Sequence, residues 1–323
     1  MAVLLALALA APKAVYVSNE ASGDVSVIAN GVEVGRIRVG TRPRGIRYRE
    51  GKLYVAVSGS PRGGPGVRDE DLPPPDRAQD GIAVVDLEHG NKVSRLPGGP
   101  DPESFDLSRD GKLLFVSNED AKLLSVVDVA AAKVVEQVAV GGEPEGVKVS
   151  PDGKLVFVTS EEDGEIDVVD ANSFKPLGKV EVAPRPRGIV FTSDGARAFV
   201  SCEQGAAVDV IDVRKRARTG RIVIPGKGQK PMGLAISDDG KRLFVSTGRG
   251  GAIAIVDTKT LRVTKTLDHV GARPWGLALS PDGRTLYSAN GPSNDVSMVD
   301  VASGKVKGRI AAGGSPWGIA IAR

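Results

Sequence analysis

A motif of proline, any residue, glycine and an aliphatic residue recurs along the whole chain. Its copies, called tetrads below, occupy residues 43–46, 102–105, 144–147, 186–189, 231–234, 274–277 and 316–319. The second copy has serine and phenylalanine at its last two positions. Successive prolines lie 59, 42, 42, 45, 43 and 42 residues apart, so one long interval precedes a regular period of about 42. Such a period indicates one structural unit per repeat.

Each repeat contains the same succession of short elements. The tetrad opens an apolar strand such as residues 146–150, and an Asp-Gly turn follows, in which glycine supplies the positive φ without steric cost. A second strand such as 114–117, a third ending in aspartate such as 166–170, and a weaker fourth such as 179–182 come next. No stretch has a convincing helical period. Four short strands in each period are typical of a propeller blade.

The two ends of the chain predict how the ring closes. Residues 15–18 have the pattern of a second strand, and residues 318–321 have that of a first strand. One blade should therefore combine three strands from residues 15–40 with an innermost strand from 316–322, which leaves no open sheet end. We expect an all-β fold: a seven-bladed β-propeller of four-stranded antiparallel blades, forming a single domain over residues 13–323.

The first twelve residues form a separate feature. Eleven of them make an apolar run too short to span a bilayer, and Ala8 and Ala10 fit an A-x-A cleavage site, although no lysine or arginine precedes the run. Residues 1–12 are therefore interpreted as the remnant of a signal peptide, and the alternative is a flexible or buried apolar end. Export predicts a periplasmic or secreted protein whose mature chain does not span the membrane.

Composition excludes several classes of site. The 323 residues include only two histidines and one cysteine, so an internal disulfide, a Cys/His zinc cluster and copper, haem or iron–sulfur sites lack ligands. His269, just before the sixth tetrad, is a candidate catalytic base, but a loop histidine can equally be a solvent-facing hydrogen bonder. The 43 basic and 40 acidic residues leave a net charge of +3, which does not indicate a nucleic-acid-binding protein.

Several strings resemble a known repeat family. The sequences VYVSN at 15–19, LFVSN at 114–118 and SPDGK at 150–154 resemble the YVTN-type β-propeller repeat. Further strings, such as GEPEG at 142–146 and SPWG at 315–318, resemble the β-propeller proteins associated with PQQ-dependent alcohol catabolism in bacteria. That resemblance implies an exported accessory protein without an established activity, with a periplasmic partner such as a quinoprotein dehydrogenase.

The tetrads are expected to surround one end of the central channel, called the mouth below. The loop that enters strand one and the loop that leaves strand two lie at the same end of each blade, so the residues flanking each proline should face this opening. Arginine could hold an anionic group through paired N–H donors, and tryptophan could stack on a planar or sugar ring. The candidate ligand-binding residues are Arg42, Arg44, Arg185, Arg187, Lys230, Arg273, Trp275 and Trp317. The alternatives are a solvated rim of mutually neutralising charges and tryptophans that only pack around a narrow channel.

The second and third tetrads carry carboxylates instead. Asp101, Glu103, Glu143 and Glu145 could hold Ca²⁺ or Mg²⁺ through oxygen ligands, whereas pairing with neighbouring arginines is the alternative. No cofactor is required by the sequence. Acidic residues that follow the second strands are interpreted as a turn preference; they are Glu20, Glu119, Glu161 and Glu203.

The long first interval contains an insertion over residues 59–80, rich in proline, glycine and charge. It leaves from the same end as the tetrads, so it could be a lid or a docking arm for a partner. The same composition is equally typical of a disordered surface loop.

Three functions remain open from the sequence. The main expectation is a monomeric, exported, non-enzymatic binding or accessory protein with a small-molecule or partner site at the mouth, linked to quinoprotein alcohol oxidation. The first alternative is a propeller enzyme of the lactonase or lyase type. The second is a DNA-binding propeller that uses the arginines and the two tryptophans, which the near-neutral charge disfavours. The fold alone does not choose among them.

Overall fold

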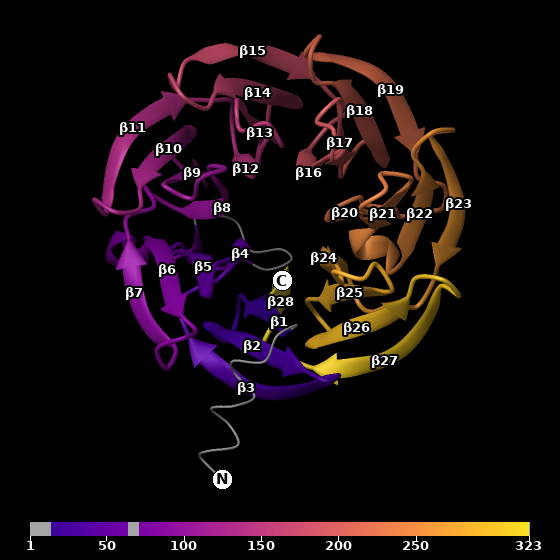
Figure 1. The fold of residues 1–323 in the computed structure, drawn as a ribbon, viewed down its shortest axis with the longest axis horizontal. Coiled ribbons are helices and arrows are strands. Elements are labelled where there is room, and N and C mark those ends of the chain that lie inside the picture. The colour runs from indigo at the N-terminus through magenta and orange to yellow at the C-terminus, as the bar shows by residue number, and fades with distance from the viewer. Residues whose placement is uncertain (1–13, 64–70, 323) are drawn as a thin grey trace.

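The computed structural model describes residues 14–63 and 71–322, and the interpreted signal remnant at 1–12 lies outside them. Within these residues the strands form seven four-stranded antiparallel sheets arranged around a central axis (Figure 1). The predicted seven-bladed β-propeller is confirmed. No helix in the described part of the chain has the length and apolar character needed to cross a membrane.

Each sheet is one blade, with its strands running from the axis outward in chain order, and the blades are numbered from the first tetrad. Blade 1 consists of β4 (Ile46–Arg49), β5 (Lys52–Val57), β6 (Gly81–Asp86) and β7 (Lys92–Leu96). Blade 2 consists of β8 (Pro102–Leu107), β9 (Leu113–Asn118), β10 (Leu123–Asp128) and β11 (Lys133–Ala139). Blade 3 consists of β12 (Pro144–Val149), β13 (Leu155–Ser160), β14 (Glu165–Asp170) and β15 (Pro176–Glu181).

The remaining blades repeat this order. Blade 4 consists of β16 (Pro186–Phe191), β17 (Arg197–Cys202), β18 (Ala207–Asp212) and β19 (Ala217–Val223). Blade 5 consists of β20 (Leu234–Ile236), β21 (Arg242–Ser246), β22 (Ile253–Asp257) and β23 (Arg262–Leu267). Blade 6 consists of β24 (Pro274–Leu279), β25 (Thr285–Asn290), β26 (Asp295–Asp300) and β27 (Lys305–Ala311). Blade 7 consists of β28 (Pro316–Ile321), β1 (Val15–Asn19), β2 (Asp24–Ala29) and β3 (Val32–Arg38). Among the described residues, the 3₁₀ turns η2 (Arg77–Gln79) and η3 (Gly248–Gly250) lie in loops.

Blade 7 joins the two ends of the chain as predicted. Strand β28 pairs antiparallel with β1, with Ile321 opposite Val15 and Ile319 opposite Val17. The innermost strand of this blade therefore comes from the end of the sequence, and its other three strands come from the beginning. The pairing removes the free edge that an open array of blades would present.

The core lies between neighbouring blades. One cluster, for example, combines Ile82 and Tyr54 of blade 1 with Phe105, Leu114 and Val116 of blade 2. Second and third strands are buried on both faces because they lie between two sheets, whereas the outermost strands such as β11 are almost wholly exposed. This gradient explains why the sequence of the fourth strands is the least apolar of each repeat.

The tetrad glycines allow the innermost strands of adjacent blades to approach closely. A Cβ on Gly146 would overlap the carbonyl oxygen of Arg187 in the next blade, and a Cβ on Gly318 would lie 2.8 Å from that of Arg44. Glycine is required here because the backbone of the neighbouring strand occupies the place of a side chain. Gly318 and Arg44 belong to blades 7 and 1, so the same contact is made where the ring closes.

A side-chain hydroxyl on the second strand stabilises this contact between blades through hydrogen bonds. Ser117 accepts a hydrogen bond from the Ser104 N–H of its own blade and donates to the Glu145 carbonyl of the next blade at 2.7 Å. At five of the seven blade junctions in the described chain a buried hydroxyl donates in this way; the donors are Ser18, Ser117, Thr159, Ser201 and Ser246. Blade 1 has Ala56 at this position, and there the Gly45 N–H donates directly to the Glu103 carbonyl.

Replacing one of these hydroxyls should weaken the ring measurably. Ser117→Ala leaves the Ser104 N–H and the Glu145 carbonyl without this partner, so the free energy of unfolding should fall by about 1–3 kcal/mol. Urea unfolding followed by circular dichroism measures the change. Ser94→Ala, at an exposed position of β7, is the matched control and should change stability by less than about 0.5 kcal/mol. Equal stability of the two variants would contradict a structural role for this hydroxyl relay, in which Ser117 bonds both Ser104 and the Glu145 carbonyl.

Candidate functional site

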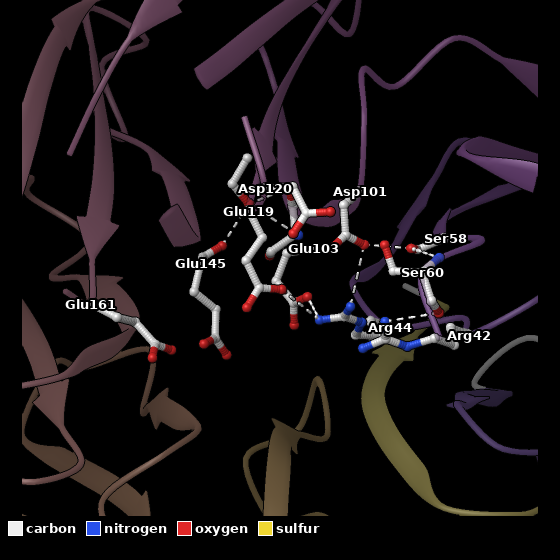
Figure 2. A network of polar contacts seen from close by, with 12 residues as sticks. Arg42, Arg44, Ser58, Ser60, Asp101, Glu103, Glu119, Asp120, Glu145 and Glu161 are labelled. Atoms are coloured by element: carbon white, nitrogen blue, oxygen red, sulfur yellow. Dashed lines mark hydrogen bonds and ion pairs between the residues drawn. The ribbon is translucent and has the colours of Figure 1, made fainter. Parts of the chain in front are cut away.

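The tetrads and the loops that follow the second strands meet at one end of the channel, as the sequence predicts. Arg44 of the first tetrad contacts Asp101 and Glu103 of the second tetrad and Glu119 after β9 (Figure 2). Arg187 of the fourth tetrad contacts Glu145 of the third and Glu161 after β13. Residues far apart in sequence therefore form two ion clusters at the mouth, one around each arginine.

The first cluster surrounds Arg44, which is only 4% exposed. Its guanidinium lies 3.5 Å from Asp101 Oδ1 and 3.4 Å from Glu119 Oε2, and it also contacts Glu103. Glu20 Oε1 approaches from blade 7, 3.9 Å from Arg44 Nε and 3.5 Å from Arg42 Nε. Arg44 thus neutralises carboxylates from blades 2 and 7 and is not free to hold an anionic ligand.

The second cluster surrounds Arg187, whose side chain is 13% exposed. Nη2 lies 2.8 Å from Glu203 Oε2, whereas Nη1 contacts both Glu145 Oε2 and Glu161 Oε1. Two carboxyl groups from blade 3 therefore lie side by side on one guanidinium nitrogen. Arg185 supports this arrangement because its Nε donates to Glu161 Oε2 at 2.6 Å.

The second cluster contains carboxyl groups whose pKa values move in opposite directions. Burial raises the pKa of Glu161 to about 8 against the opposing charge of Arg185, and the carboxylates of Glu119, Glu143 and Glu203 act in the same direction as burial. For Glu203, burial also acts upward, but Arg187, Arg185 and Lys230 together hold its pKa below the ordinary value. Burial thus favours the protonated form of Glu161, whereas the neighbouring cations favour the ionised form of Glu203. A carboxylic acid beside carboxylates is the combination that general acid–base catalysis requires.

An axial cavity of about 160 Å³ begins at the mouth and continues between the innermost strands. Arg187 and Glu145 line it at the mouth, together with Trp275 and Trp317. Deeper in the channel its wall consists of glycines and aliphatic side chains of the first strands, such as Leu277. The charged cluster around Arg187 is therefore continuous with a partly apolar cavity.

The two tryptophans form one unit on blades 6 and 7. Their rings pack edge to face with centroids 5.4 Å apart, and the Arg273 guanidinium lies 4.9 Å from the Trp275 ring centroid. The indole Nε1 atoms of both are buried, and no acceptor for either occurs among the described residues. The packing of the two rings therefore leaves both indole N–H groups without a hydrogen bond within the described protein.

The predicted ligand-binding residues fall into two groups. Arg42, Arg44, Arg185 and Arg187 all pair with carboxylates. Lys230 and Arg273 have no carboxylate within ion-pair distance in the described chain, and Trp275 and Trp317 line the cavity. The arginines of blades 1 and 4 are thus neutralised by carboxylates, as the alternative interpretation of the mouth expected. They are largely buried, however, and do not form a solvated rim.

The predicted calcium or magnesium ligands are divided between the two clusters. Asp101 and Glu103 face Arg44, and Glu145 faces Arg187, so pairing with arginine is what the structure shows for these three. Glu143 lines a separate polar groove of about 560 Å³ with Arg185. No three His, Cys, Asp or Glu side chains are placed to hold a metal ion within residues 14–63 and 71–322.

Two other candidates lie outside the clusters. His269 is exposed, with a positive φ of 57°, and its backbone carbonyl accepts a hydrogen bond from Arg309. The described ends of the insertion contact the mouth: Arg62 lies 3.4 Å from Glu20 Oε2, and Arg77 pairs with Asp120. Whether the insertion acts as a lid or a docking arm stays a prediction.

The carboxylates after the second strands are the functional candidates that sequence reasoning missed. Glu20, Glu119, Glu161 and Glu203 were expected from turn preference alone, yet each contacts an arginine of a tetrad. Their shared repeat position, at the same end as the basic tetrads, was the available signal. The particular pairing was not readable, because it joins neighbouring blades.

Two family models match parts of the chain. Residues 74–149 match a YNCE-like β-propeller model, and residues 171–313 match a model of the lactonase family, described as a 7-bladed β-propeller. Among curated proteins, none matches this sequence. The chain is thus a β-propeller protein with partial likeness to both families.

Solved structures share the fold over nearly the whole chain. A periplasmic gluconolactonase from Pseudomonas aeruginosa is 20% identical, with a TM-score of 0.76, covering 97% of this chain and 99% of that one. A Bacteroides fragilis protein put forward as a 6-phosphogluconolactonase is 17% identical, with a TM-score of 0.77 and the same coverage. A functionally unknown protein from Desulfotomaculum acetoxidans is 14% identical, with a TM-score of 0.80, also covering 97% and 99%. At these identities the likeness shows the fold.

The main functional expectation from the sequence is corrected by these matches. A non-enzymatic accessory module was expected because histidine and cysteine are scarce. The match of residues 171–313 to the lactonase family model instead favours the enzyme alternative. The scarcity of histidine was a poor guide because the buried cluster supplies carboxyl groups with shifted pKa values.

Removing Arg187 should destabilise the fold strongly. Arg187→Met leaves Glu145, Glu161 and Glu203 buried beside one another without their shared cation, so the free energy of unfolding should fall by about 3–5 kcal/mol at pH 7. Chemical denaturation measures the loss. Arg36→Met is the matched control, since this arginine is 43% exposed and pairs only with Glu33, and it should cost at most about 1 kcal/mol. A similar small loss in both variants would contradict a buried ion cluster.

Proposed function

We propose that this protein hydrolyses lactones at the mouth, with the Arg187 cluster as its catalytic centre. The observation that carries the proposal is the pair of Glu145 and Glu161 on one nitrogen of Arg187. Burial raises the pKa of Glu161 to about 8, which favours its protonated form. Glu145 lines the axial cavity, whereas Glu161 lines the adjoining polar groove with Arg185, so the pair links an acid to a carboxyl group at the cavity wall. The lactonase match over residues 171–313 supports the same reaction class.

The chemistry follows from the two roles. Ionised Glu145 accepts a proton from a water molecule, whose oxygen attacks the carbonyl carbon of the lactone. The carbonyl π electrons move to its oxygen, and collapse of this tetrahedral species breaks the bond between the carbonyl carbon and the ring oxygen. Glu161 donates its proton to the departing ring oxygen, which gives an open hydroxy acid. The proton on Glu145 then returns to Glu161, which restores the pair.

The arginines position these carboxyl groups. Arg187 holds Glu145 and Glu161 adjacent through a single nitrogen and is fixed on its other side by Glu203. Arg185 fixes the second oxygen of Glu161. Arg187 and Arg185 carry two positive charges between them, whereas three carboxyl groups contact these guanidiniums, so one negative charge is left in excess and favours the proton on Glu161.

The setting of this reaction stays a prediction. Export to the periplasm or the cell exterior is proposed from residues 1–12, and a periplasmic location is stated for the Pseudomonas aeruginosa gluconolactonase. Neither matching family model names the PQQ-associated group, so that finer likeness remains a proposal from the sequence motifs. A quinoprotein partner, the monomeric state and a role for Ca²⁺ or Mg²⁺ likewise remain untested proposals.

The pH dependence of hydrolysis tests the acid. We expect the purified protein to open γ- or δ-lactones in a pH-stat assay, with kcat falling as the pH rises through about 8, because Glu161 loses its proton there. Glu161→Gln and Glu145→Gln should each lower kcat by about 100-fold or more. Glu88→Gln changes an exposed side chain at the opposite end of blade 1 and should leave the rate unchanged. The proposal fails if no lactone in the panel is hydrolysed above the buffer rate.

A further inference from the structure

Two buried indole N–H donors at the mouth have no hydrogen-bond acceptor within the described protein. They are the indole Nε1 groups of Trp275 and Trp317, the chain's only tryptophans, at equivalent positions of adjacent tetrads. A buried donor without an acceptor is unfavourable, and native proteins keep such groups mainly at functional sites. Both side chains line the axial cavity together with Arg187 and Glu145.

The backbone holds these indoles in fixed places. Ser246 donates to the Trp275 carbonyl at 2.6 Å, and a Cβ on Gly276 would overlap the Trp317 carbonyl, so the two tetrads are in close contact. The rings also brace one another edge to face. Donors fixed in this way before substrate binds need no rearrangement when charge develops on an acceptor.

Arg273 makes the site electropositive. Its guanidinium stacks on the Trp275 ring, 4.9 Å from the centroid, and has no carboxylate within ion-pair distance in the described residues. A cation on the face of the ring draws electron density from it, which strengthens the indole N–H as a donor. The carboxylates of the mouth come from blades 2 to 4 and blade 7, whereas Arg273 belongs to blade 6. An oxygen that gains negative charge is therefore favoured beside the tryptophans.

We propose that the Nε1–H groups of Trp275 and Trp317 are the donors to the lactone carbonyl oxygen and hold its negative charge in the tetrahedral species. The proposal rests on the lactone hydrolysis described above and adds the electrophilic half of that site. Water attack moves the carbonyl electron pair onto this oxygen, the two N–H groups stabilise it, and its collapse sends the ring oxygen to the proton of Glu161. Both tryptophans are thus catalytic residues through their N–H groups.

The first test removes each donor while keeping an aromatic ring. Trp275→Phe and Trp317→Phe should each lower kcat for the best lactone about 10- to 100-fold with little change in KM, since the interaction strengthens as charge develops. Both variants should retain the wild-type decline in rate above about pH 8. Tyr54→Phe, at a tyrosine in blade 1 outside the cavity lining, is the matched control and should keep full activity.

A second test does not require turnover. The protein has two tryptophans, so its ¹H–¹⁵N spectrum should contain two indole resonances, each assigned by its loss in one Phe variant. Titration with δ-valerolactam, which presents a carbonyl oxygen but resists hydrolysis, should shift both indole resonances downfield. Each Phe variant should bind the lactam several-fold more weakly than the wild type.

The outcomes separate this proposal from the proposed function. Hydrolysis with unchanged kcat in both Phe variants, or a raised KM alone, would overturn the donor role while leaving lactone hydrolysis intact. Lactam-induced shifts of both indole resonances without any lactone turnover would support the carbonyl-binding donors and contradict the reaction. The melting temperature of each Phe variant shows whether it folds. If a variant does not fold, the titration of the wild-type protein with the lactam decides the question. Indole resonances that do not shift in that titration would refute the proposal.

Discussion

The close contact between innermost strands is the constraint on which the rest of this structure depends. Six of the seven tetrads contribute a glycine, so the neighbouring strand can approach, and at five blade junctions of the described chain a hydroxyl of the second strand then bonds both blades. Because the contact joins one tetrad to the next, it fixes the residues flanking each glycine around the mouth. The ring and the site are thus products of the same interaction. The relay is lost in blade 1, where Ala56 replaces the hydroxyl, and a direct backbone bond between tetrads takes its place.

This ring brings more carboxylates around each central arginine than one cation can balance. Arg44 and Arg187 each contact at least three carboxylates, and all of these except Glu119, whose side chain is 36% exposed, are largely shielded from water. Excess negative charge in a low-dielectric setting is relieved when one carboxyl group retains its proton. Glu161 is such a group, because burial raises its pKa to about 8. Charge pairing that stabilises the ring therefore also prepares an acid. Structural and catalytic roles are not separable at such a cluster, which is why its loss should affect folding as well as rate.

The opposite arc of the mouth has a different character. Blades 5 and 6 contribute Lys230 and Arg273 without carboxylate partners, and blades 6 and 7 contribute the two indoles. A substrate at the top of the axial cavity would thus face Glu145 and Arg187 on one side, with Glu161 behind them on the same guanidinium nitrogen as Glu145, and the two indoles on the other. Such a division suits the addition of water to a carbonyl group, in which a proton is removed from the nucleophile while charge grows on oxygen.

The fold was readable from the sequence because its signals are local and repeated. The tetrad period, the Asp-Gly turns and the strand patterns at residues 15–18 and 318–321 predict the blades, their number and the closure of the ring. The arrangement of tetrads around one mouth followed from the antiparallel order of strands. The identity of the site did not follow, because Arg187 meets Glu161 and Glu145 from another blade and Glu203 from its own only after the ring has formed. Burial and charge crowding, which determine the pKa of Glu161 and leave two indoles without acceptors, are properties of that assembled ring and of no single repeat.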